Sequence, residues 1–347
     1  MDIPLLQLFL ASVITFISIN LLRPFAVSIN LVDIPKGRKK HVGDVPLIGG
    51  ISMFLGIVIS ILTSPYDLNQ FSYFILVALI ILIIGVLDDH RNISVSLRLF
   101  FQVLVGIIVV SAGDLSLKSL GNITGSGNLV LNQWGYFISV IAIILGMNAV
   151  NMADGIHGLA GGNSLITFVA ILYLSIDSLV SESLLIVLLF CSVLPVFLIH
   201  NLCLGIATSK RIFMGDAGSM FIGLSIVWVL IDLSQGENKS FSPVTALWLF
   251  SVPIIDISSA ILRRLTSGKS PFKADLFHIH HILLQLGFSH TKTLLLILFT
   301  SFIMAIIGIL GEYYRISDQT MISFFIMICG IYIPIYMMLI KKIKVRI

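Results

Sequence analysis

Residues 80–92 read IILIIGVLDDHRN, a run of apolar side chains that ends in two adjacent aspartates. Such runs fill the chain: 57% of its 347 residues are hydrophobic, 11% are charged, and the mean hydropathy is +1.07. Soluble domains carry about 25% charged residues. The composition therefore predicts an all-α polytopic membrane protein. The apolar runs are continuous rather than alternating, which favours spanning helices over a membrane barrel.

Eleven apolar segments are candidate membrane spans, although several are shorter than the ~20 residues of a typical transmembrane helix. The first segment follows an acid and precedes Arg23, the reverse of a secretory signal, so we expect it to be retained as a span. We expect one membrane domain across residues 1–347. The segments cover residues 3–22, 47–62, 71–87, 97–112, 135–152, 164–176, 184–204, 219–233, 243–262, 294–310 and 321–340.

The basic residues set the predicted orientation, because short loops rich in Lys and Arg stay in the cytoplasm. With the N-terminus outside, 18 of the 21 Lys and Arg residues fall on the cytoplasmic side, and only Lys118, Lys239 and Arg315 fall outside. The C-terminus is then cytoplasmic. The predicted cytoplasmic loops lie near residues 23–46, 88–96, 153–163, 205–218 and 263–293.

Asp88 and Asp89 end the third segment on the predicted cytoplasmic side. A carboxylate at a helix C-terminus is disfavoured by the helix dipole by about 0.3–1 kcal/mol, and adjacent acids also repel each other. A divalent cation would offset both effects, because Mg²⁺ is commonly held by one or two carboxylates together with phosphate oxygens. The alternative is a solvated helix end that Arg91 neutralises.

Two further motifs bring polar groups to the same predicted side of the membrane. NAVNMADG closes the fifth segment, and its spacing puts Asn148, Asn151 and Asp154 on one side of a helix. Such groups need a polar cavity or a polar partner, so helix–helix hydrogen bonding is the alternative. FMGDAGS opens the eighth segment, where Asp216 is a good N-cap and the glycine amides suit a phosphate.

The stretch DLFHIHHILLQLGFSH contains His278, His280 and His281, and it follows Arg263 and Arg264. It lacks the spacing of a zinc protease. A basic, histidine-bearing cytoplasmic loop suits phosphate or pyrophosphate; the alternative is an ordinary basic loop with an amphipathic helix. The other long cytoplasmic loop, DIPKGRKKHVGDVPLIGG, has the same character and contains Lys39, Lys40 and His41.

GVLDDH, NAVNMADG, FMGDAGS and HIHH, in this order, resemble the polyprenyl-phosphate N-acetylhexosamine-1-phosphate transferase family. The similarity is greatest to the branch that uses UDP-GlcNAc and undecaprenyl phosphate. It implies a Mg²⁺- or Mn²⁺-dependent reaction that gives undecaprenyl-pyrophosphoryl-GlcNAc and UMP at the cytoplasmic face of the bacterial inner membrane. This step would initiate synthesis of enterobacterial common antigen and O-antigen lipopolysaccharide. We expect no nucleic-acid partner, and both a monomer and a homodimer stay open.

The resemblance also implies residue roles. Asp216 is the first choice for a metal ligand, and Asp88 and Asp89 would bind metal or deprotonate the acceptor phosphate. Phe213 would stack on uracil, and Lys39, Lys40 and His41 would receive the lipid phosphate. The remaining substrate contacts would come from Asn148, Asn151, Asp154, His157, Arg263, Arg264, His278, His280 and His281.

One position departs from the family pattern. The family usually reads DGxDGL, whereas this chain reads DGIHGL, so His157 stands in place of an aspartate. The exchange removes one carboxylate from any metal scheme there. It favours a role for this position in substrate binding rather than in metal binding.

Two other functions compete with this interpretation. The transferase for UDP-MurNAc-pentapeptide is a relative, but HIHH differs from the contiguous histidine triplet of that branch. A transporter would place its ionisable groups near the bilayer midplane, whereas these acids lie at the ends of segments. Asp256 is the only acid well inside a predicted span, a few residues from Arg263.

Overall fold

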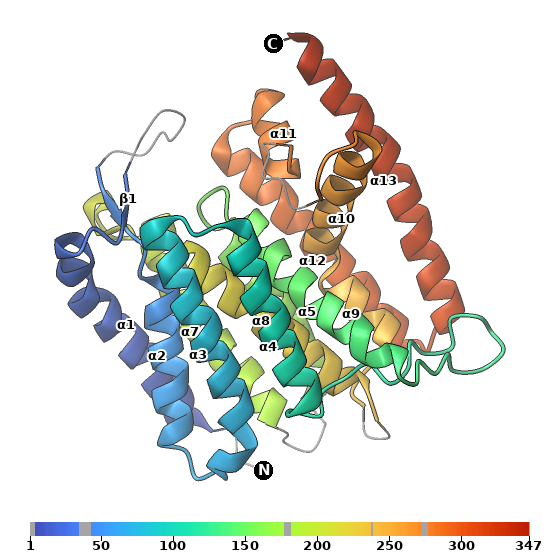
Figure 1. Cartoon of the computed structure of the whole chain (residues 1–347), viewed down its shortest axis with the longest axis horizontal. Coiled ribbons are helices and arrows are strands. Elements are labelled where there is room, and N and C mark those ends of the chain that lie inside the picture. Colours follow the sequence, from blue (N-terminus) through green and yellow to red (C-terminus); the bar gives the residue numbers. More distant parts are fainter. Residues whose placement is uncertain (1–3, 35–42, 177–181, 237–238, 272–276, 347) are drawn as a thin grey trace.

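The computed structural model describes residues 4–34, 43–176, 182–236, 239–271 and 277–346, and most of them are helical (Figure 1). The prediction of an all-α polytopic membrane protein is confirmed. Within the described residues, the one sheet is a two-stranded ribbon, β1 (Val32–Asp33) with β2 (Val45–Pro46). The helices are α1 Leu5–Ser28, α2 Gly49–Leu62, α3 Leu68–Arg91, α4 Val95–Ser111, α5 Trp134–Ala153, α6 Leu159–Ser175, α7 Glu182–Leu202, α8 Gly215–Ser234, α9 Pro243–Leu249, α10 Ser251–Thr266, α11 Ile279–Gln285, α12 His290–Tyr313 and α13 Asp318–Arg346.

Where the structure describes them, the predicted apolar segments fall on helices, and the segment 243–262 is divided between α9 and α10. Among the described residues, seven helices are long and apolar enough to cross a membrane, and α9 with α10, bent by 84°, would make an eighth. The helices α2, α4 and α6 are apolar but shorter. The count of eleven crossings and the orientation stay predictions. The start of α1 and the end of α13 lie at opposite ends of the molecule (Figure 1).

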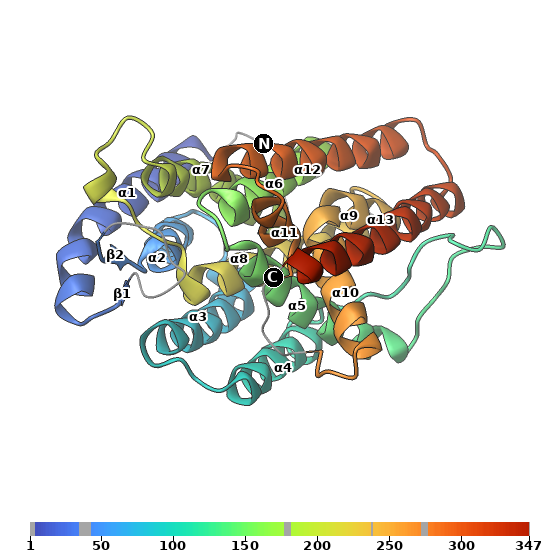
Figure 2. The same ribbon diagram turned by 90° about the horizontal axis from the view of Figure 1, so that it is seen from above.

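Helix α8 is the centre of the bundle. It is apolar on all sides, nearly all its side chains are buried, and α2, α3, α5 and α7 surround it (Figure 2). Glycines allow the backbones to approach, as is common between membrane helices. A Cβ at Gly50 would collide with the backbone of Gly218, and one at Gly223 would collide with the backbone of Gly146. These contacts fix the position of α8 against its neighbours.

The end of α3 is set by local sequence. Asn92 takes the left-handed conformation at φ 49°, and its N–H bonds to the carbonyl of Asp88, which is a common way for a helix to end. The side chain of Ser94 then caps α4 by accepting from the amide of Leu97. This short turn sends α4 back alongside α3 and brings Arg98 next to the end of α3.

The last helices carry the histidine stretch. Its residues form α11, a short helix that packs against α13 through Ile282, Tyr336 and Ile340. It lies at the same end of the molecule as the turn between α3 and α4 (Figure 1). The fold therefore collects the ends of α3 and α5, the start of α8 and the histidine stretch at one end of the bundle.

Candidate active site

Asp89 joins the end of α3 to the start of α8. Its Oδ1 accepts a hydrogen bond from the amide of Asp216 at 2.8 Å, and its Oδ2 accepts from the amide of Ala217 at 3.2 Å. The prediction that Asp216 caps α8 is wrong, because Asp216 lies inside the first turn and Asp89 provides the cap from another helix. Gly215 makes this possible: its φ is +75°, and a Cβ there would meet the carboxylate of Asp89.

Asp88 and Asp216 bring two more carboxylates to the same place. Oδ2 of Asp88, which is 6% exposed, accepts from Nη1 of Arg98 at 2.9 Å. Oδ1 of Asp216 accepts from Nδ2 of Asn151 at 2.6 Å, and the side chains of Asp88 and Asp216 also lie in contact. The alternative, in which Arg91 neutralises this helix end, does not hold for Asp88, because its partner is Arg98. One guanidinium faces several carboxylates, so the site attracts a cation.

Asp154 follows the last turn of α5 and faces the same cluster. Its amide bonds to the carbonyl of Asn151. Burial, together with the nearby carboxylates of Asp216 and Asp89, raises the pKa of Asp154 well above the ordinary value for an aspartate. The ends of α3 and α5 and the start of α8 thus converge, as the sequence predicted.

His157 and Phe213 form one wall beside the carboxylates. Their rings stack with centroids 5.0 Å apart and an angle of 28° between the planes. Nη1 of Arg211 lies 3.4 Å from Nε2 of His157, and because a guanidinium only donates, this imidazole nitrogen accepts. The arrangement offers a flat aromatic surface next to a positive charge, which suits a base attached to phosphates.

The loop that carries Arg211 and Phe213 is held from two sides. The side chain of Asn201 accepts from the amide of Gly158 at 2.6 Å and donates to the carbonyl of Ile212 at 2.9 Å. The guanidinium of Arg23 on α1 donates to the carbonyls that end the short 3-10 helix Thr208–Lys210, those of Ser209, Lys210 and Arg211. The aromatic wall is therefore placed before any ligand arrives.

His280 is the histidine that reaches the cluster. It is 1% exposed, and neither ring nitrogen has a hydrogen-bond partner among the described residues. The ring fills the space beside Gly155, where any Cβ would collide with it. Burial and the neighbouring rings of His281 and His278 lower the pKa of His280 to about 2. A neutral imidazole with free nitrogens in a buried position is suited to hydrogen-bond a ligand.

The two arginines predicted to grip pyrophosphate lie inside the protein. Arg264 is 1% exposed and its Nη1 donates to the carbonyl of Pro271 at 2.6 Å. Arg263 is 7% exposed, its Nε donates to the hydroxyl of Tyr336 at 3.2 Å, and its guanidinium lies 5.0 Å from the ring centroid of Phe277. These contacts hold the histidine stretch, and a direct contact with substrate stays a prediction.

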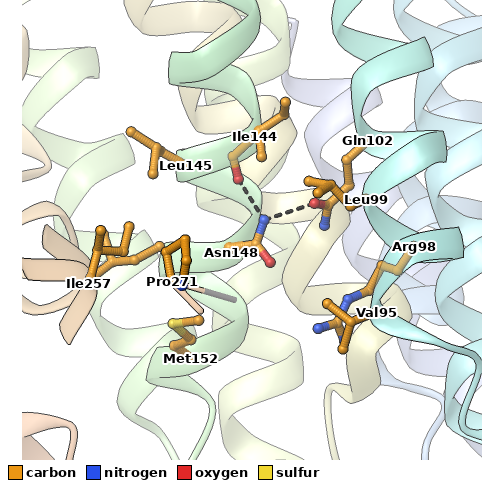
Figure 3. Close-up of a pocket in the computed structure, with 11 residues that line it drawn as sticks. Val95, Arg98, Leu99, Gln102, Ile144, Leu145, Asn148, Met152, Ile257 and Pro271 are labelled. Atoms are coloured by element: carbon orange, nitrogen blue, oxygen red, sulfur yellow. Dashed lines mark hydrogen bonds between the residues drawn. The ribbon is translucent and has the colours of Figure 1, made fainter. Parts of the chain in front are cut away.

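A narrow pocket opens beside the carboxylates, between α4, α5 and α10 (Figure 3). In it, Nδ2 of Asn148 donates to Oε1 of Gln102 and to the carbonyl of Ile144, both at 2.8 Å. Arg98, the partner of Asp88, lies at one end, and most of the wall is apolar. The lining residues are Val95, Arg98, Leu99, Gln102, Ile144, Leu145, Asn148, Met152, Ile257, Ile261 and Pro271.

Arg98, Gln102 and Arg211 were not among the predicted site residues. The signal for Gln102 and Arg98 was present, because each is a polar residue within an apolar helix, where such residues are usually functional. By contrast, the predicted Lys39, Lys40 and His41 lie outside the described residues. His281 lies with its ring 4.1 Å from that of His280, centroid to centroid.

The carboxylates of the site fit Mg²⁺ or Mn²⁺ if the ion is held by two of them and not by a larger group of side chains. Among the described residues, no group of three or more His, Cys, Asp or Glu side chains surrounds one point. Mg²⁺, however, is usually held by one or two carboxylates and completes its shell with water and substrate phosphates. Asp88 and Asp216, in contact with each other, are the residues that could hold such an ion.

Comparison with known proteins gives consistent matches. Residues 71–234 match the profile described as Glycosyl transferase family 4. The undecaprenyl-phosphate alpha-N-acetylglucosaminyl 1-phosphate transferase of Escherichia coli strain K12 is 38% identical over 313 residues, 89% of this chain and 84% of the relative. The protein of the same description from Haemophilus influenzae is 38% identical over 331 residues, which cover 93% and 91% of the two chains.

Proposed function

The chain belongs to glycosyl transferase family 4, with the undecaprenyl-phosphate alpha-N-acetylglucosaminyl 1-phosphate transferases, and from this membership we propose its reaction. It transfers GlcNAc-1-phosphate from UDP-GlcNAc to undecaprenyl phosphate and releases UMP. An oxygen of the acceptor phosphate bonds to the β-phosphorus of UDP-GlcNAc. The bond from that phosphorus to the UMP oxygen breaks, and UMP leaves with the electron pair.

The observation that carries the proposal is the convergence of Asp88, Asp154 and Asp216 at one end of the bundle. Both substrates are anionic, so their approach needs positive charge, as in phosphoryl transfer generally. Asp216 and Asp88 would hold Mg²⁺ or Mn²⁺, which when bound neutralises the charge on the pyrophosphate oxygens. Asn151 orients Asp216 through its 2.6 Å hydrogen bond.

The acceptor lipid needs a site with an apolar part for its prenyl chain and a polar part for its phosphate. The pocket between α4, α5 and α10 offers an apolar wall for a prenyl chain, and Arg98 at its end offers a donor for the phosphate. Arg98 is held toward the cluster by Asp88. A phosphate monoester has its second pKa near 6, so it is ionised at neutral pH and needs little help from a base. Binding and positioning are therefore the main tasks of these residues.

The donor nucleotide would lie on the other side of the carboxylates. The stacked rings of His157 and Phe213 offer an aromatic surface for uracil, and Arg211 lies next to them. His280, with its free ring nitrogens, would hydrogen-bond the pyrophosphate or the sugar. Asp89 has both oxygens committed to the start of α8, so its role is to hold Asp216 in place rather than to accept a proton.

The setting of the reaction is also part of the proposal. The distribution of Lys and Arg supports a site at the cytoplasmic face of the inner membrane. The product would be the first lipid-linked sugar for a surface polysaccharide such as enterobacterial common antigen or O antigen. Undecaprenyl phosphate would then reach the pocket from the lipid, and UDP-GlcNAc would reach it from the cytoplasm.

The test uses purified protein in detergent with radiolabelled UDP-GlcNAc. We expect UMP release only when undecaprenyl phosphate and Mg²⁺ or Mn²⁺ are both present. UMP formation from UDP-MurNAc-pentapeptide but not from UDP-GlcNAc would assign the other branch of the family. The absence of UMP with either donor would overturn the transferase proposal and favour a transporter.

A further inference from the structure

Asp256 is a buried acid for which the proposed transfer has no use. It lies within α10 and is 7% exposed, and α10 reaches the end of the molecule that carries α11 (Figure 1). Its two carboxylate oxygens serve one short segment. Oδ2 accepts from Nδ1 of His278 at 2.8 Å, and Oδ1 accepts from the amide of Ile279 at 2.9 Å. An acid inside a membrane helix is costly, so a dedicated pair of donors indicates a specific role.

The contact fixes the tautomer of His278. Because Asp256 accepts at Nδ1, that nitrogen carries the proton. Nε2 of His278 lies 3.5 Å from Nη2 of Arg264, and a guanidinium can only donate, so Nε2 is the acceptor. Asp256, His278 and Arg264 therefore form a line of carboxylate, neutral imidazole and guanidinium, and both ring nitrogens of His278 are used within the protein.

The row of Asp256, His278 and Arg264 is connected to the candidate active site in two directions. His280 is two residues from His278, with its ring at a centroid distance of 6.2 Å and an angle of 9° to that of His278. His280 then packs on Gly155 beside Asp154. In the other direction Arg264 donates to the carbonyl of Pro271, a residue of the pocket wall. One carboxylate thus supports both the free histidine and the side of the pocket.

We propose that Asp256 is a positioning residue for the transfer reaction: it fixes the tautomer of His278 and the start of α11, and so holds His280 at the carboxylate cluster. The inference rests on the proposed function for the reaction that is measured. Asp256 touches no substrate and acts through His278, much as a carboxylate orients a histidine in other sites. This role differs from that of His278 itself, whose nitrogens are engaged.

An amide cannot replace this carboxylate. In Asp256→Asn, one of the two positions becomes an NH₂ donor. If the NH₂ faces the Ile279 amide, two donors oppose each other. If it faces His278, the proton must move to Nε2 and then opposes Arg264. Each arrangement leaves one pair of donors in conflict, whereas Asp256→Glu keeps two acceptors and should restore part of the activity.

The experiment measures UMP formation by Asp256→Asn, Asp256→Glu and the matched control Asp232→Asn, an exposed acid on α8. We expect Asp256→Asn to lower kcat by about 10–100-fold, the range typical for loss of a group that orients a metal-bound histidine. KM for UDP-GlcNAc should stay within about threefold, because transition-state positioning rather than ground-state binding is lost. In a His278→Ala background, Asp256→Asn should cost much less than it does alone.

Hydrogen exchange of residues 277–285 is measured on the same samples and needs no substrate. Asp256→Asn should speed exchange there, and Asp232→Asn should not. The inference would be overturned if Asp256→Asn left both kcat and hydrogen exchange unchanged. It would also be overturned if the fold-loss in kcat of the double variant equalled the product of the fold-losses of Asp256→Asn and His278→Ala. If Asp256→Asn does not fold, wild-type kcat in His278→Ala would overturn it. Wild-type protein that makes no UMP would refute the proposed function, while the exchange result would still decide the role of Asp256.

Discussion

The carboxylate of Asp89 on α3 accepts a hydrogen bond from the amide of Asp216, which lies 127 positions later on α8. The backbone amides of the first turn of α8 are therefore capped by a side chain from the last turn of α3. Asp89 ties the two carboxylates that could hold metal, Asp88 beside it and Asp216 opposite, into one rigid unit. The separate roles of the adjacent acids lead to a first prediction.

Asp89→Asn should destabilise the protein more than Asp88→Asn does. The asparagine at position 89 keeps one acceptor and turns a donor toward an amide, so the helix cap is lost at a cost of about 0.5–2 kcal/mol. The asparagine at position 88 keeps an oxygen for Arg98. Thermal unfolding of both variants in the same detergent measures the difference, and equal midpoints would contradict the assigned cap.

Asp216→Asn should weaken the response to metal. The variant loses one of the two carboxylates that could hold Mg²⁺, so the Mg²⁺ concentration for half-maximal turnover should rise by at least about 10-fold. The control is Asp232→Asn on the same helix, which should behave as wild type. Removal of metal with a chelator should stop UMP formation by the wild type. A half-maximal concentration that is the same in Asp216→Asn and wild type would exclude Asp216 as a ligand.

His157→Asp tests the position where the chain departs from its family. The substitution removes the ring that stacks on Phe213 and changes the contact with Arg211, so KM for UDP-GlcNAc should change. The Mg²⁺ concentration for half-maximal turnover should stay the same, because His157 belongs to the aromatic wall. If the variant instead needed less Mg²⁺ than wild type, the restored carboxylate would be part of the metal site.

His280 should make stability depend on pH. Its pKa is lowered to about 2 in the folded protein, against an ordinary value near 6.5, so between these values the unfolded chain binds one more proton. Stability from this residue is therefore present above pH ~6.5 and is lost as the pH falls. His280→Phe, which cannot titrate, should gain stability relative to wild type between pH 7 and pH 5. The exposed His290 provides the control His290→Gln, and a pH-independent difference for His280→Phe would contradict the assignment.

Hydropathy and the order of motifs were enough to predict the helices and the convergence of Asp88, Asp154 and Asp216. Local rules failed where a partner comes from elsewhere in the chain. Asp216 fits an N-cap by its sequence position, yet Asp89 takes that role because α3 and α8 pack side by side. Likewise Arg263 and Arg264 look like free cations in the sequence, but tertiary contacts bury them. Contacts between helices that are distant in the sequence depend on how the helices pack, and a hydropathy pattern does not predict that packing.

The packing of α11 on α13 has a consequence for biogenesis. Ile282 rests against Tyr336 and Ile340, and α13 is translated after every other described helix. During membrane insertion, the ends of α3, α5 and α8 can assemble while the histidine segment still lacks its support. While α13 is still inside the ribosome, most of the other helices would thus be assembled, but the chain would not be able to catalyse the transfer.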